Sequence, residues 1–294
     1  MTEKISAALQ KKPILISDGA WGTFLQQQGL KPGECPESWN LSHPETILKA
    51  ARAYIEAGAD MIQTNSFGGS RFKLEQYELA DQTEAINKAA AELSRQAAGS
   101  DHWVIASVGP TGKMLAMGDV KETDFFDVFA QQEQALSAGG ADALCIETMS
   151  DIAEAVQAVK AAKNKTDCEV IATFTWSKTK QGSYKTMMGA TPEAAAGAVL
   201  DAGADIIGAN CGNGIKGMID IVKILRQTFS NTPILVHANA GLPQNINGRD
   251  VFPEAPAAMA AQVKELNKAG ADIIGGCCGT TPEHIKAIKA ALTT

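Results

Sequence analysis

The sequence predicts an α/β protein with the (β/α)8 or TIM-barrel fold, formed as a single domain by residues 1–294. Eight apolar runs rich in β-branched residues recur along the chain, and a helical pattern follows each of them. Eight such units within about 250 residues match the usual size of a TIM barrel. A doubly wound open sheet is the alternative, but eight strand–helix pairs favour a closed barrel. No linker or low-complexity segment indicates a second domain.

The apolar runs are nearly continuous rather than alternating, as parallel strands are when both of their faces are covered. They span residues 13–18, 61–65, 104–108, 143–147, 169–174, 206–210, 234–238 and 273–276. The helical patterns span residues 45–56, 83–97, 124–138, 151–162, 192–201, 216–227, 257–268 and 282–291. Strands and helices are therefore predicted to alternate along nearly the whole chain.

A short repeat marks junctions at which a predicted helix ends and a strand begins. The sequence Ala-Gly-Ala-Asp occurs at residues 57–60, 202–205 and 269–272, and Gly-Gly-Ala-Asp occurs at residues 139–142. Glycine suits the left-handed backbone position that commonly follows a helix end. The repeat therefore supports the predicted alternation.

The composition is that of a globular protein and excludes several classes of partner. Hydrophobic residues make up 45% of the chain and charged residues 20%. A net charge of −7 without a basic cluster argues against nucleic acid and anionic membranes as partners. No apolar run approaches the roughly 18 residues of a membrane span, and the N-terminus lacks a signal-peptide core. We therefore expect a cytoplasmic protein whose six cysteines are ligands or core residues rather than disulfides.

Polar and glycine-rich segments follow the predicted strands, at the end of the barrel where the chemistry of TIM-barrel enzymes gathers. These segments are residues 18–23, 64–69, 109–112, 147–151 and 237–243. Their concentration at this end favours an enzyme over a structural scaffold.

Two adjacent cysteines, Cys277 and Cys278, follow the last apolar run and have glycines on both sides. Neighbouring side chains in a strand point to opposite faces, so both sulfurs can serve one site only if the chain turns here. The flanking glycines permit that turn. Cys211 follows the sixth apolar run in an equivalent place. Three thiols on two loops predict a zinc site with an open fourth position, and the alternative is a set of buried structural cysteines.

Three thiolate ligands suit a metal that activates a sulfur nucleophile. A free thiol with a pKa of about 8.5 is mostly protonated at neutral pH, whereas zinc binding deprotonates it. Sulfur ligands also favour zinc over magnesium or calcium. Three cysteinates outweigh the charge of the zinc ion, and an incoming thiolate adds to that excess. The incoming sulfur should therefore remain nucleophilic without a neighbouring base.

Several segments resemble motifs of the zinc-dependent homocysteine S-methyltransferases, in the order in which that family has them. They are residues 18–20, 64–68, 208–211, 239–243 and 275–282. Residues 18–23 and 239–243 look closest to the homocysteine-binding barrel of cobalamin-dependent methionine synthase. The resemblance implies a TIM barrel with three zinc ligands, Cys211, Cys277 and Cys278. It also places Asn239 in the site, at the fourth position of zinc when no thiol is bound.

The resemblance further implies how the amino acid end of a substrate is held. Asp18 and Glu147 would hold its ammonium group, although such carboxylates also cap helices or bind loops. The backbone amides of Gly19 and Ala20 would bind its carboxylate. His237 could be a further metal ligand, but a lone histidine is more often held by hydrogen bonds within the structure.

The family implies transfer of a methyl group to the thiol of L-homocysteine, which gives L-methionine. The chain is too short for additional folate or cobalamin domains and has no Asp-x-His-x-x-Gly run. We therefore expect methylcobalamin as the donor, carried by a separate corrinoid protein. S-methylmethionine is the alternative donor, and a related thiol is an alternative acceptor. A non-catalytic zinc-binding subunit that docks a partner is the hypothesis from a different class.

Overall fold

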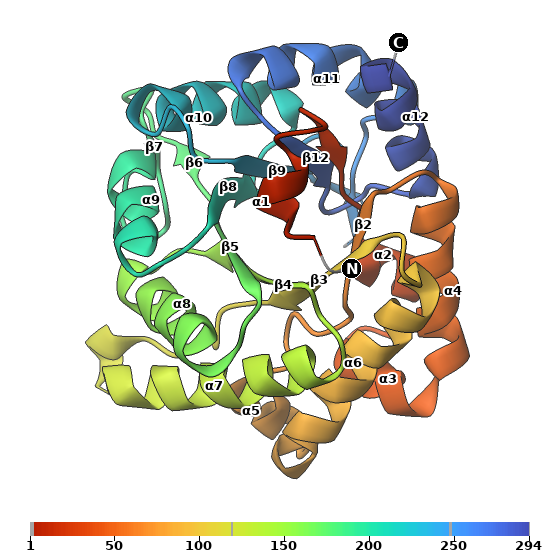
Figure 1. The fold of residues 1–294 in the computed structure, drawn as a ribbon, viewed down its shortest axis with the longest axis vertical. Coiled ribbons are helices and arrows are strands. Elements are labelled where there is room, and N and C mark those ends of the chain that lie inside the picture. The colour runs from red at the N-terminus through yellow and green to blue at the C-terminus, as the bar shows by residue number, and fades with distance from the viewer. Residues whose placement is uncertain (1–2, 119, 247–248, 294) are drawn as a thin grey trace.

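Eight parallel strands form one curved sheet in the computed structural model, which describes residues 3–118, 120–246 and 249–293 (Figure 1). Their hydrogen-bonded order is β1-β12-β9-β8-β5-β4-β3-β2. In chain order they are β1 (Leu15–Ile16), β2 (Met61–Gln63), β3 (Trp103–Val108), β4 (Ala143–Met149), β5 (Glu169–Phe174), β8 (Ile206–Asn210), β9 (Ile234–Ala238) and β12 (Ile273–Gly276). Each of these strands lies within or overlaps a predicted run, because a long apolar run between polar segments is best buried as a strand.

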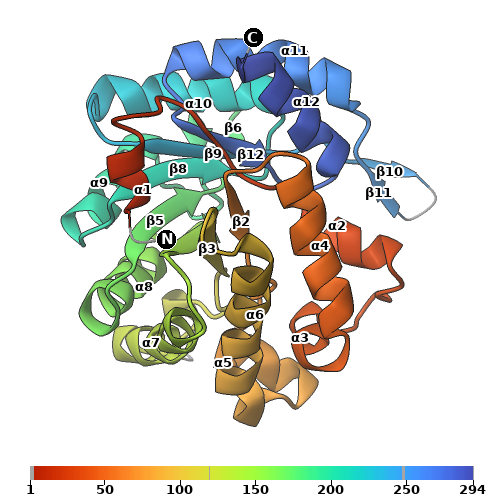
Figure 2. The same ribbon diagram turned by 45° about the vertical axis from the view of Figure 1, so that its right-hand side comes forward.

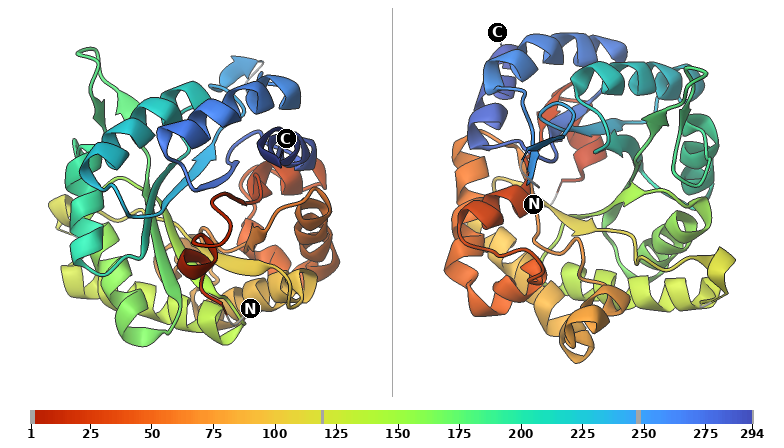
Figure 3. Two further views of the ribbon diagram at one scale, coloured as in Figure 1. Left: turned by 45° about the horizontal axis from the view of Figure 1, so that its top comes forward. Right: turned by 180° about the vertical axis from the view of Figure 1, so that it is seen from behind.

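Helices alternate with the strands and surround the sheet, as Figure 2 and Figure 3 show. They are α4 (Pro44–Glu56), α6 (Thr83–Ala98), α7 (Glu122–Ala138), α8 (Ile152–Lys165), α9 (Pro192–Asp201), α10 (Ile215–Thr228), α11 (Pro256–Ala269) and α12 (Pro282–Thr293). The predicted TIM barrel is thereby confirmed. Across the described ranges, no helix is long and apolar enough to cross a membrane.

Short elements that the sequence did not predict lie mostly in the segments that follow strands. The short helices are α2 (Trp21–Gln27), η1 (Pro36–Ser38), α3 (Trp39–Ser42), α5 (Arg71–Leu74), η2 (Glu75–Tyr77), η3 (Ala80–Gln82) and η4 (Leu115–Met117). Two antiparallel hairpins join β6 (Ser177–Lys178) to β7 (Tyr184–Lys185) and β10 (Gln244–Ile246) to β11 (Arg249–Val251). Elements this short carry no apolar period of their own, so the sequence pattern does not reveal them.

In the described residues, no backbone ladder joins β1 to β2. Aspartate side chains connect these two strands instead. The backbone N–H of Asp60 donates to the Ile16 carbonyl over 2.7 Å, and Asp60 Oδ2 accepts the Ile16 N–H over 2.8 Å. At the other end of the strands, Asp18 Oδ2 accepts the backbone N–H of Gln63 over 2.7 Å. Asp18 thus helps to close the barrel at its mouth, the end at which the strands terminate.

The aspartates that end each copy of the predicted repeat share one set of contacts. Each carboxylate accepts the backbone N–H of a residue in the preceding barrel strand, namely Ile16 over 2.8 Å, Val104 over 2.8 Å, Val170 over 2.9 Å and Ile234 over 2.8 Å. Each also pairs with a cation that precedes that strand, namely Lys12, Arg95, Lys163 and Arg226. The repeat glycines before them have positive φ angles of 100–116°, as predicted for the residue after a helix end.

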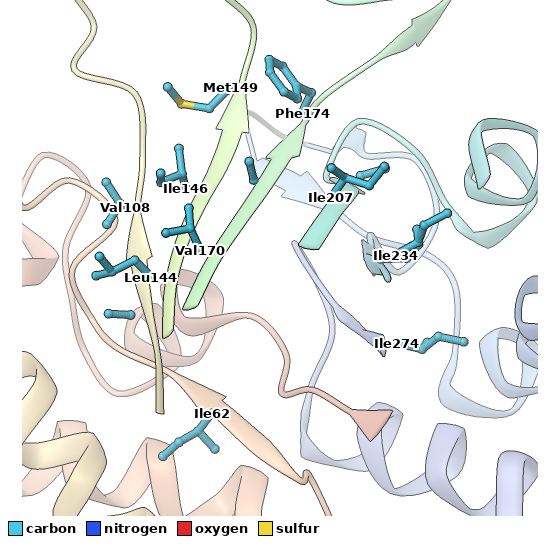
Figure 4. Close-up of a cluster of buried hydrophobic side chains, with 14 of the residues drawn as sticks. Ile62, Val108, Leu144, Ile146, Met149, Val170, Phe174, Ile207, Ile234 and Ile274 are labelled. Atoms are coloured by element: carbon cyan, nitrogen blue, oxygen red, sulfur yellow. The ribbon is translucent and has the colours of Figure 1, made fainter. Parts of the chain in front are cut away.

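Apolar side chains fill both sides of the sheet. Figure 4 shows part of the outer layer, in which Ile62, Leu144 and Ile207 belong to one cluster with side chains of the surrounding helices. A separate cluster fills the barrel interior towards the amino-terminal ends of the strands and includes Leu15 and Ile171. Burial on both faces explains why the strands read as continuous apolar runs.

The N-terminal helix α1 (Ile5–Ala8) closes the amino-terminal end of the barrel interior (Figure 1). Its buried residues Ile5 and Ala8 belong to the interior cluster. Glu169, the first residue of β5, accepts the backbone N–H of Ile5 and, over 3.1 Å, that of Ser6. Helix amides that lack a partner within the helix are thus satisfied by a strand carboxylate. Access to the interior is therefore from the mouth.

Candidate metal centre and active-site cavity

The barrel interior changes from apolar to polar towards the mouth. Side chains alternate along a strand, so the residue two positions after an inward-pointing apolar residue also points inward. Counting on from the interior cluster gives a set that we call the interior polar layer: Ser17, Gln63, Ser107, Glu147, Thr173, Gly208, His237 and Gly275. Gln63, Ser107, Glu147 and His237 of this layer line a cavity of about 270 Å³.

The three predicted zinc ligands meet in the wall of this cavity. The sulfur atoms of Cys211, Cys277 and Cys278 all lie within 4.8 Å of one another. Cys278 Sγ is 3.8 Å from Cys211 Sγ and 4.0 Å from Cys277 Sγ. Zinc–sulfur bonds of about 2.3 Å at tetrahedral angles place two sulfurs about 3.8 Å apart, whereas a disulfide would bring them to about 2.05 Å. The thiols thus have the spacing of ligands to one metal ion.

The last residues of β9 and the segment that follows it hold both cysteine loops in place. The Cys211 N–H donates to the His237 carbonyl over 3.0 Å, and the Cys277 N–H donates to the Ala238 carbonyl over 2.7 Å. The Cys278 carbonyl accepts the Ala240 N–H over 3.0 Å. Cys211 has a φ of +57°, a left-handed conformation that non-glycine residues seldom adopt. Such strain persists where surrounding contacts impose it, often at functional sites.

Thr280 connects the cysteine loop to the segment after β1. Its hydroxyl donates to the Cys277 carbonyl over 2.7 Å and accepts the Ala20 N–H over 3.1 Å. The Ala20 amide thus has a partner within the protein. Its predicted use for a substrate carboxylate, like that of the Gly19 amide, stays a prediction. Thr280 was not predicted as a site residue, since its partner lies 260 positions away in the chain.

The two predicted substrate carboxylates differ in position. Glu147 lines the cavity, whereas Asp18 is fully buried and is not among the lining residues. Asp18 Oδ2 accepts hydrogen bonds from Trp21 Nε1 over 2.8 Å and from the Gln63 N–H over 2.7 Å. The Gln63 side chain in turn donates to Glu147 Oε1 over 2.8 Å, and the Ser107 hydroxyl donates to the same oxygen. Gln63 therefore connects the two acids by hydrogen bonds, and the Asp18 carboxylate lies outside the cavity lining.

Burial dominates the ionisation of these acids. It raises the pKa of Asp18 to about 7 and that of Glu147 to about 7, and the charge of Asp18 adds to the effect on Glu147. No lysine or arginine in the described chain lines the cavity. A ligand that brings a positive charge would therefore favour the ionised form of Glu147 and be held by it.

The thiols influence one another's ionisation. Hydrogen bonds from Cys277 and Cys278 lower the pKa of Cys211, and the Asn239 side chain lowers it further. The same contacts to Cys211 raise the pKa of Cys277 and of Cys278. Hydrogen bonds from the other two thiols thus stabilise the first thiolate formed in the cluster. A metal cation would replace the thiol protons.

His237 and Asn239 are buried polar residues with unused hydrogen-bonding atoms. His237 is 1% exposed and Asn239 is 3% exposed. Neither His237 Nε2 nor Asn239 Oδ1 has a hydrogen-bond partner among the described residues. Burial lowers the pKa of His237 to about 4, so its imidazole is neutral near pH 7. The group of side chains spaced as metal ligands consists of the three cysteines and does not include His237. No hydrogen bond to a described residue accounts for the burial of His237 Nε2.

Glu37 is a further cavity residue that the sequence did not indicate. It lies in η1, lines the cavity and is 5% exposed. Its Oε1 accepts the Gly68 N–H over 2.6 Å, and the Cys35 thiol lies 3.3 Å from its Oε2. Burial and the Glu37 charge raise the pKa of Cys35 to about 12, so this thiol is protonated. Only the folded chain brings the segments after β1 and β2 together here.

Comparison with known proteins identifies the family of this chain. The model of the homocysteine S-methyltransferase family matches residues 15–292 of this chain. The chain belongs to this family. The family match covers both cysteine loops and all eight barrel strands described above.

Two methionine synthases each contain a region that is similar to most of this chain. The chain is 30% identical over 293 residues to methionine synthase from Mycobacterium leprae (strain TN). It is 31% identical over 297 residues to methionine synthase from Mycobacterium tuberculosis (strain ATCC 25618 / H37Rv). Each match covers 95% of this chain and 24% of the relative. The chain thus spans about a quarter of the length of these curated relatives.

A solved homocysteine methyltransferase has the same fold. The metallated form of MmuM from Escherichia coli superimposes with a TM-score of 0.79 and 24% sequence identity. The match covers 97% of this chain and 98% of that chain. The similarity in structure therefore extends around the whole barrel.

Proposed function

We propose that this chain transfers a methyl group to the thiol of L-homocysteine and so forms L-methionine. The observation that carries the proposal is the meeting of three thiols, at the spacing of ligands to one tetrahedral ion, in the wall of a cavity that also holds Glu147. Homocysteine has a thiol for the first feature and an ammonium group for the second. Membership of the homocysteine S-methyltransferase family supports the same activity.

Cys211, Cys277 and Cys278 would hold zinc, and Asn239 would occupy the fourth position until a substrate thiol takes its place. The distances between the sulfurs fit this role, and so does the buried, unpartnered Oδ1 of Asn239 beside Cys211. Thiolate ligands select zinc over magnesium or calcium. Bound zinc would keep the substrate thiol deprotonated at neutral pH.

Glu147 would bind the substrate ammonium through its Oε2 atom. Oε1 already accepts hydrogen bonds from Gln63 and Ser107, whereas the nearest donor to Oε2 is Asn210 Nδ2 at 3.5 Å. Asp18 would add negative charge from behind Gln63 without touching the ligand. The Gly19 amide would face the substrate carboxylate, and the amides that begin α2 would add favourable partial charges.

Methyl transfer would follow by in-line displacement at the methyl carbon. An electron pair of the substrate sulfur forms the new sulfur–carbon bond, while the bond between the methyl carbon and the donor breaks and leaves its electrons on the donor. The thiol has already lost its proton, so no side chain has to act as a general base in this step. The protein would contribute by holding the sulfur and the amino acid end in one orientation.

The rim of the barrel supports a donor that a partner protein presents. In the described chain, the exposed large apolar side chains all lie in segments that join a strand's carboxyl end to the next barrel helix. They are Leu41, Phe67, Tyr77, Met114, Met117, Met187, Met188, Leu242 and Val251, and we call them the apolar rim. Exposed apolar groups mark interaction sites, and methionine suits adaptable ones. We propose that a separate corrinoid protein docks here and delivers methylcobalamin.

Glu37 favours an alternative donor, S-methylmethionine. This buried carboxylate lines the cavity and lies apart from the Glu147 hydrogen-bond network. S-methylmethionine carries a sulfonium and an ammonium group, so an additional anion would help to retain it. A small cationic donor could enter the cavity without a partner protein.

Methionine formation tests the proposal and separates the donors. Zinc-loaded protein is incubated with L-homocysteine and either methylcobalamin or S-methylmethionine, and methionine is measured by mass spectrometry. Chelator-treated protein is the control. Methionine from methylcobalamin and not from S-methylmethionine is expected, and the opposite result would establish the alternative donor. No product with either donor and no binding of homocysteine would favour a non-catalytic zinc-binding subunit.

A further inference from the structure

His237 is the exception in the interior polar layer. Ser17 contacts Asp18, Gln63 and Ser107 donate to Glu147, and Thr173 donates to Asn210. His237 is 1% exposed, and its Nε2 has no partner in the part of the chain that the structure describes. A buried polar atom without a partner is unfavourable, so native structures seldom keep one without a function. His237 also lines the cavity, where a ligand can supply the missing contact.

The imidazole of His237 lies close to Gly275 and is not part of the three-thiol group. His237 pairs in register with Gly275 on β12, and a Cβ built on Gly275 would lie 2.9 Å from His237 Cδ2. The same Cβ would lie 2.7 Å from the Asp18 carbonyl oxygen and 2.8 Å from Ser17 Cβ. Because Gly275 has no side chain, the imidazole can approach the end of β1. The three clustered thiols form their metal-spaced group without it.

An ammonium group bound near His237 would have more N–H donors than the nearby carboxylates can accept. An ammonium has three N–H donors. The Asp18 carboxylate accepts hydrogen bonds from Trp21, Gln63 and Ser17 and does not line the cavity. Glu147 Oε1 accepts two hydrogen bonds, whereas the contact of Oε2 is a long one from Asn210 Nδ2 over 3.5 Å. A further acceptor in the wall would therefore satisfy another N–H group of the ammonium.

We propose that His237 is a substrate-positioning residue that accepts a hydrogen bond from the homocysteine ammonium beside Glu147. The inference rests on the proposed function, since it assumes that homocysteine is the ligand. It assigns to His237 the selection of amino acid thiols over thiols that lack the amino group. The neutral ring has one acceptor nitrogen available for this contact.

Ligands that lack one group of homocysteine test the assignment. The zinc-loaded full chain is titrated calorimetrically with L-homocysteine, with 4-mercaptobutyrate, which lacks the amino group, and with 3-mercaptopropylamine, which lacks the carboxylate. His237→Phe should weaken binding of the two amines by about tenfold, as expected for loss of a hydrogen bond to a charged group. Binding of 4-mercaptobutyrate should change less than twofold. Equal weakening of all three ligands, or unchanged binding of homocysteine, would overturn the proposal.

Further variants separate positioning from damage to the fold. His237→Gln places an amide oxygen near the position of Nε2 and should restore most of the affinity for homocysteine. A glutamine variant that binds no better than the phenylalanine variant would argue against an acceptor role. His102→Phe, next to the amino-terminal end of β3, is the matched control and should leave all three affinities unchanged. Failure of the unaltered protein to bind homocysteine would instead refute the proposed function itself.

Discussion

At the scale of single residues, the protonation of Glu147 should set how tightly an amino acid thiol binds. Burial raises the pKa of Glu147 to about 7, and the nearby charge of Asp18 contributes. Below that pH the carboxyl group is protonated and cannot attract an ammonium. The affinity of the zinc-loaded protein for L-homocysteine should therefore fall as the pH is lowered from 8 to 6. Calorimetric titration at several pH values measures this change.

The thiol contributes a pH dependence of its own, because metal binding releases its proton. Titration with 4-mercaptobutyrate isolates that contribution, since this ligand has the thiol and lacks the ammonium. Homocysteine should show the steeper dependence, and Glu147→Gln should make the two ligands alike. Parallel profiles for both ligands with the unaltered protein would contradict the role of Glu147.

Glu133 on α7 should make the stability of the protein depend on pH. Its side chain is fully buried, neither carboxyl oxygen has a partner among the described residues, and burial raises its pKa well above the usual range. The folded protein therefore keeps a proton that the unfolded chain loses above about pH 4.3. The stability contributed by this group is complete below that pH and is lost as the pH rises, at up to about 1.4 kcal/mol per unit.

Glu133→Gln removes this titration and should raise the Tm at pH 8 more than at pH 5. Differential scanning fluorimetry at both pH values measures the effect, with the exposed Glu84→Gln on α6 as a control that should change neither Tm. An equal shift at both pH values would show that ionisation of Glu133 is not the cause.

The sequence predicts the site best where a residue type carries its own chemistry. Adjacent cysteines between glycines have few uses other than a metal, and the structure brings them together with Cys211. Gln63 and Ser107 were missed, because strands that are apolar on both faces do not show in sequence which residues point inward. The contact of the Ala20 amide with Thr280 was not predicted, because it joins opposite ends of the chain.

At the scale of elements, Glu169 should hold α1 in the amino-terminal end of the barrel. Its carboxylate accepts the backbone N–H groups of Ile5 and Ser6. Glu169→Ala should lower the free energy of unfolding by about 1–2 kcal/mol, as expected when a helix loses its N-terminal cap. Urea unfolding measures the loss. Homocysteine binding by the zinc-loaded variant should be unchanged, since α1 lies away from the mouth.

The substitution Glu3→Gln, at a half-buried position in the segment just before α1, is a matched control. Glu3 forms its ion pair with the largely exposed Lys11, and such pairs contribute about 0–1 kcal/mol. A loss of stability in Glu3→Gln as large as that in Glu169→Ala would argue against a specific role for the buried carboxylate.

The long strands and helices were predictable because each is long enough to show its own pattern. A helix repeats its apolar residues over several turns, and a strand is a run of consecutive apolar residues. Their predicted and observed bounds differ mostly by one or two residues, as for α6 and α10. The short helices and the two hairpins after β5 and β9 were not predicted. Their positions depend on contacts between loops, such as that between Glu37 and Gly68, rather than on local periodicity.

At the scale of the whole molecule, the metal centre should be separable from the fold. The three cysteines lie on loops and belong to none of the hydrophobic clusters. Cys278→Ala should therefore lose most of its zinc while its circular dichroism and Tm stay close to those of the unaltered protein. Plasma emission spectroscopy measures the metal.

Cys145→Ala should have the opposite effect, because Cys145 is buried in the barrel interior. This variant should keep its zinc and lose stability, by roughly 1–2 kcal/mol for a small cavity. Global unfolding of Cys278→Ala would show that the metal centre supports the barrel.

The number and order of the strands could be predicted, whereas the manner of closure could not. Eight β-then-α units indicate a barrel, but nothing in the local pattern shows that Asp18 and Asp60 bridge β1 and β2. The apolar rim does not stand out in the sequence, because a methionine in a loop is not distinguishable by sequence from one that fills a gap in the core.

The aspartate contacts at the amino-terminal end of the barrel divide it into quarters. Asp60 joins β1 to β2, Asp142 joins β3 to β4, Asp205 joins β5 to β8, and Asp272 joins β9 to β12. No strand takes part in two of these bridges, so the four carboxylates fasten four separate pairs of strands, while backbone ladders join each pair to the next. These bridges lie opposite the mouth, so changes in the loops that follow the strands would leave them in place.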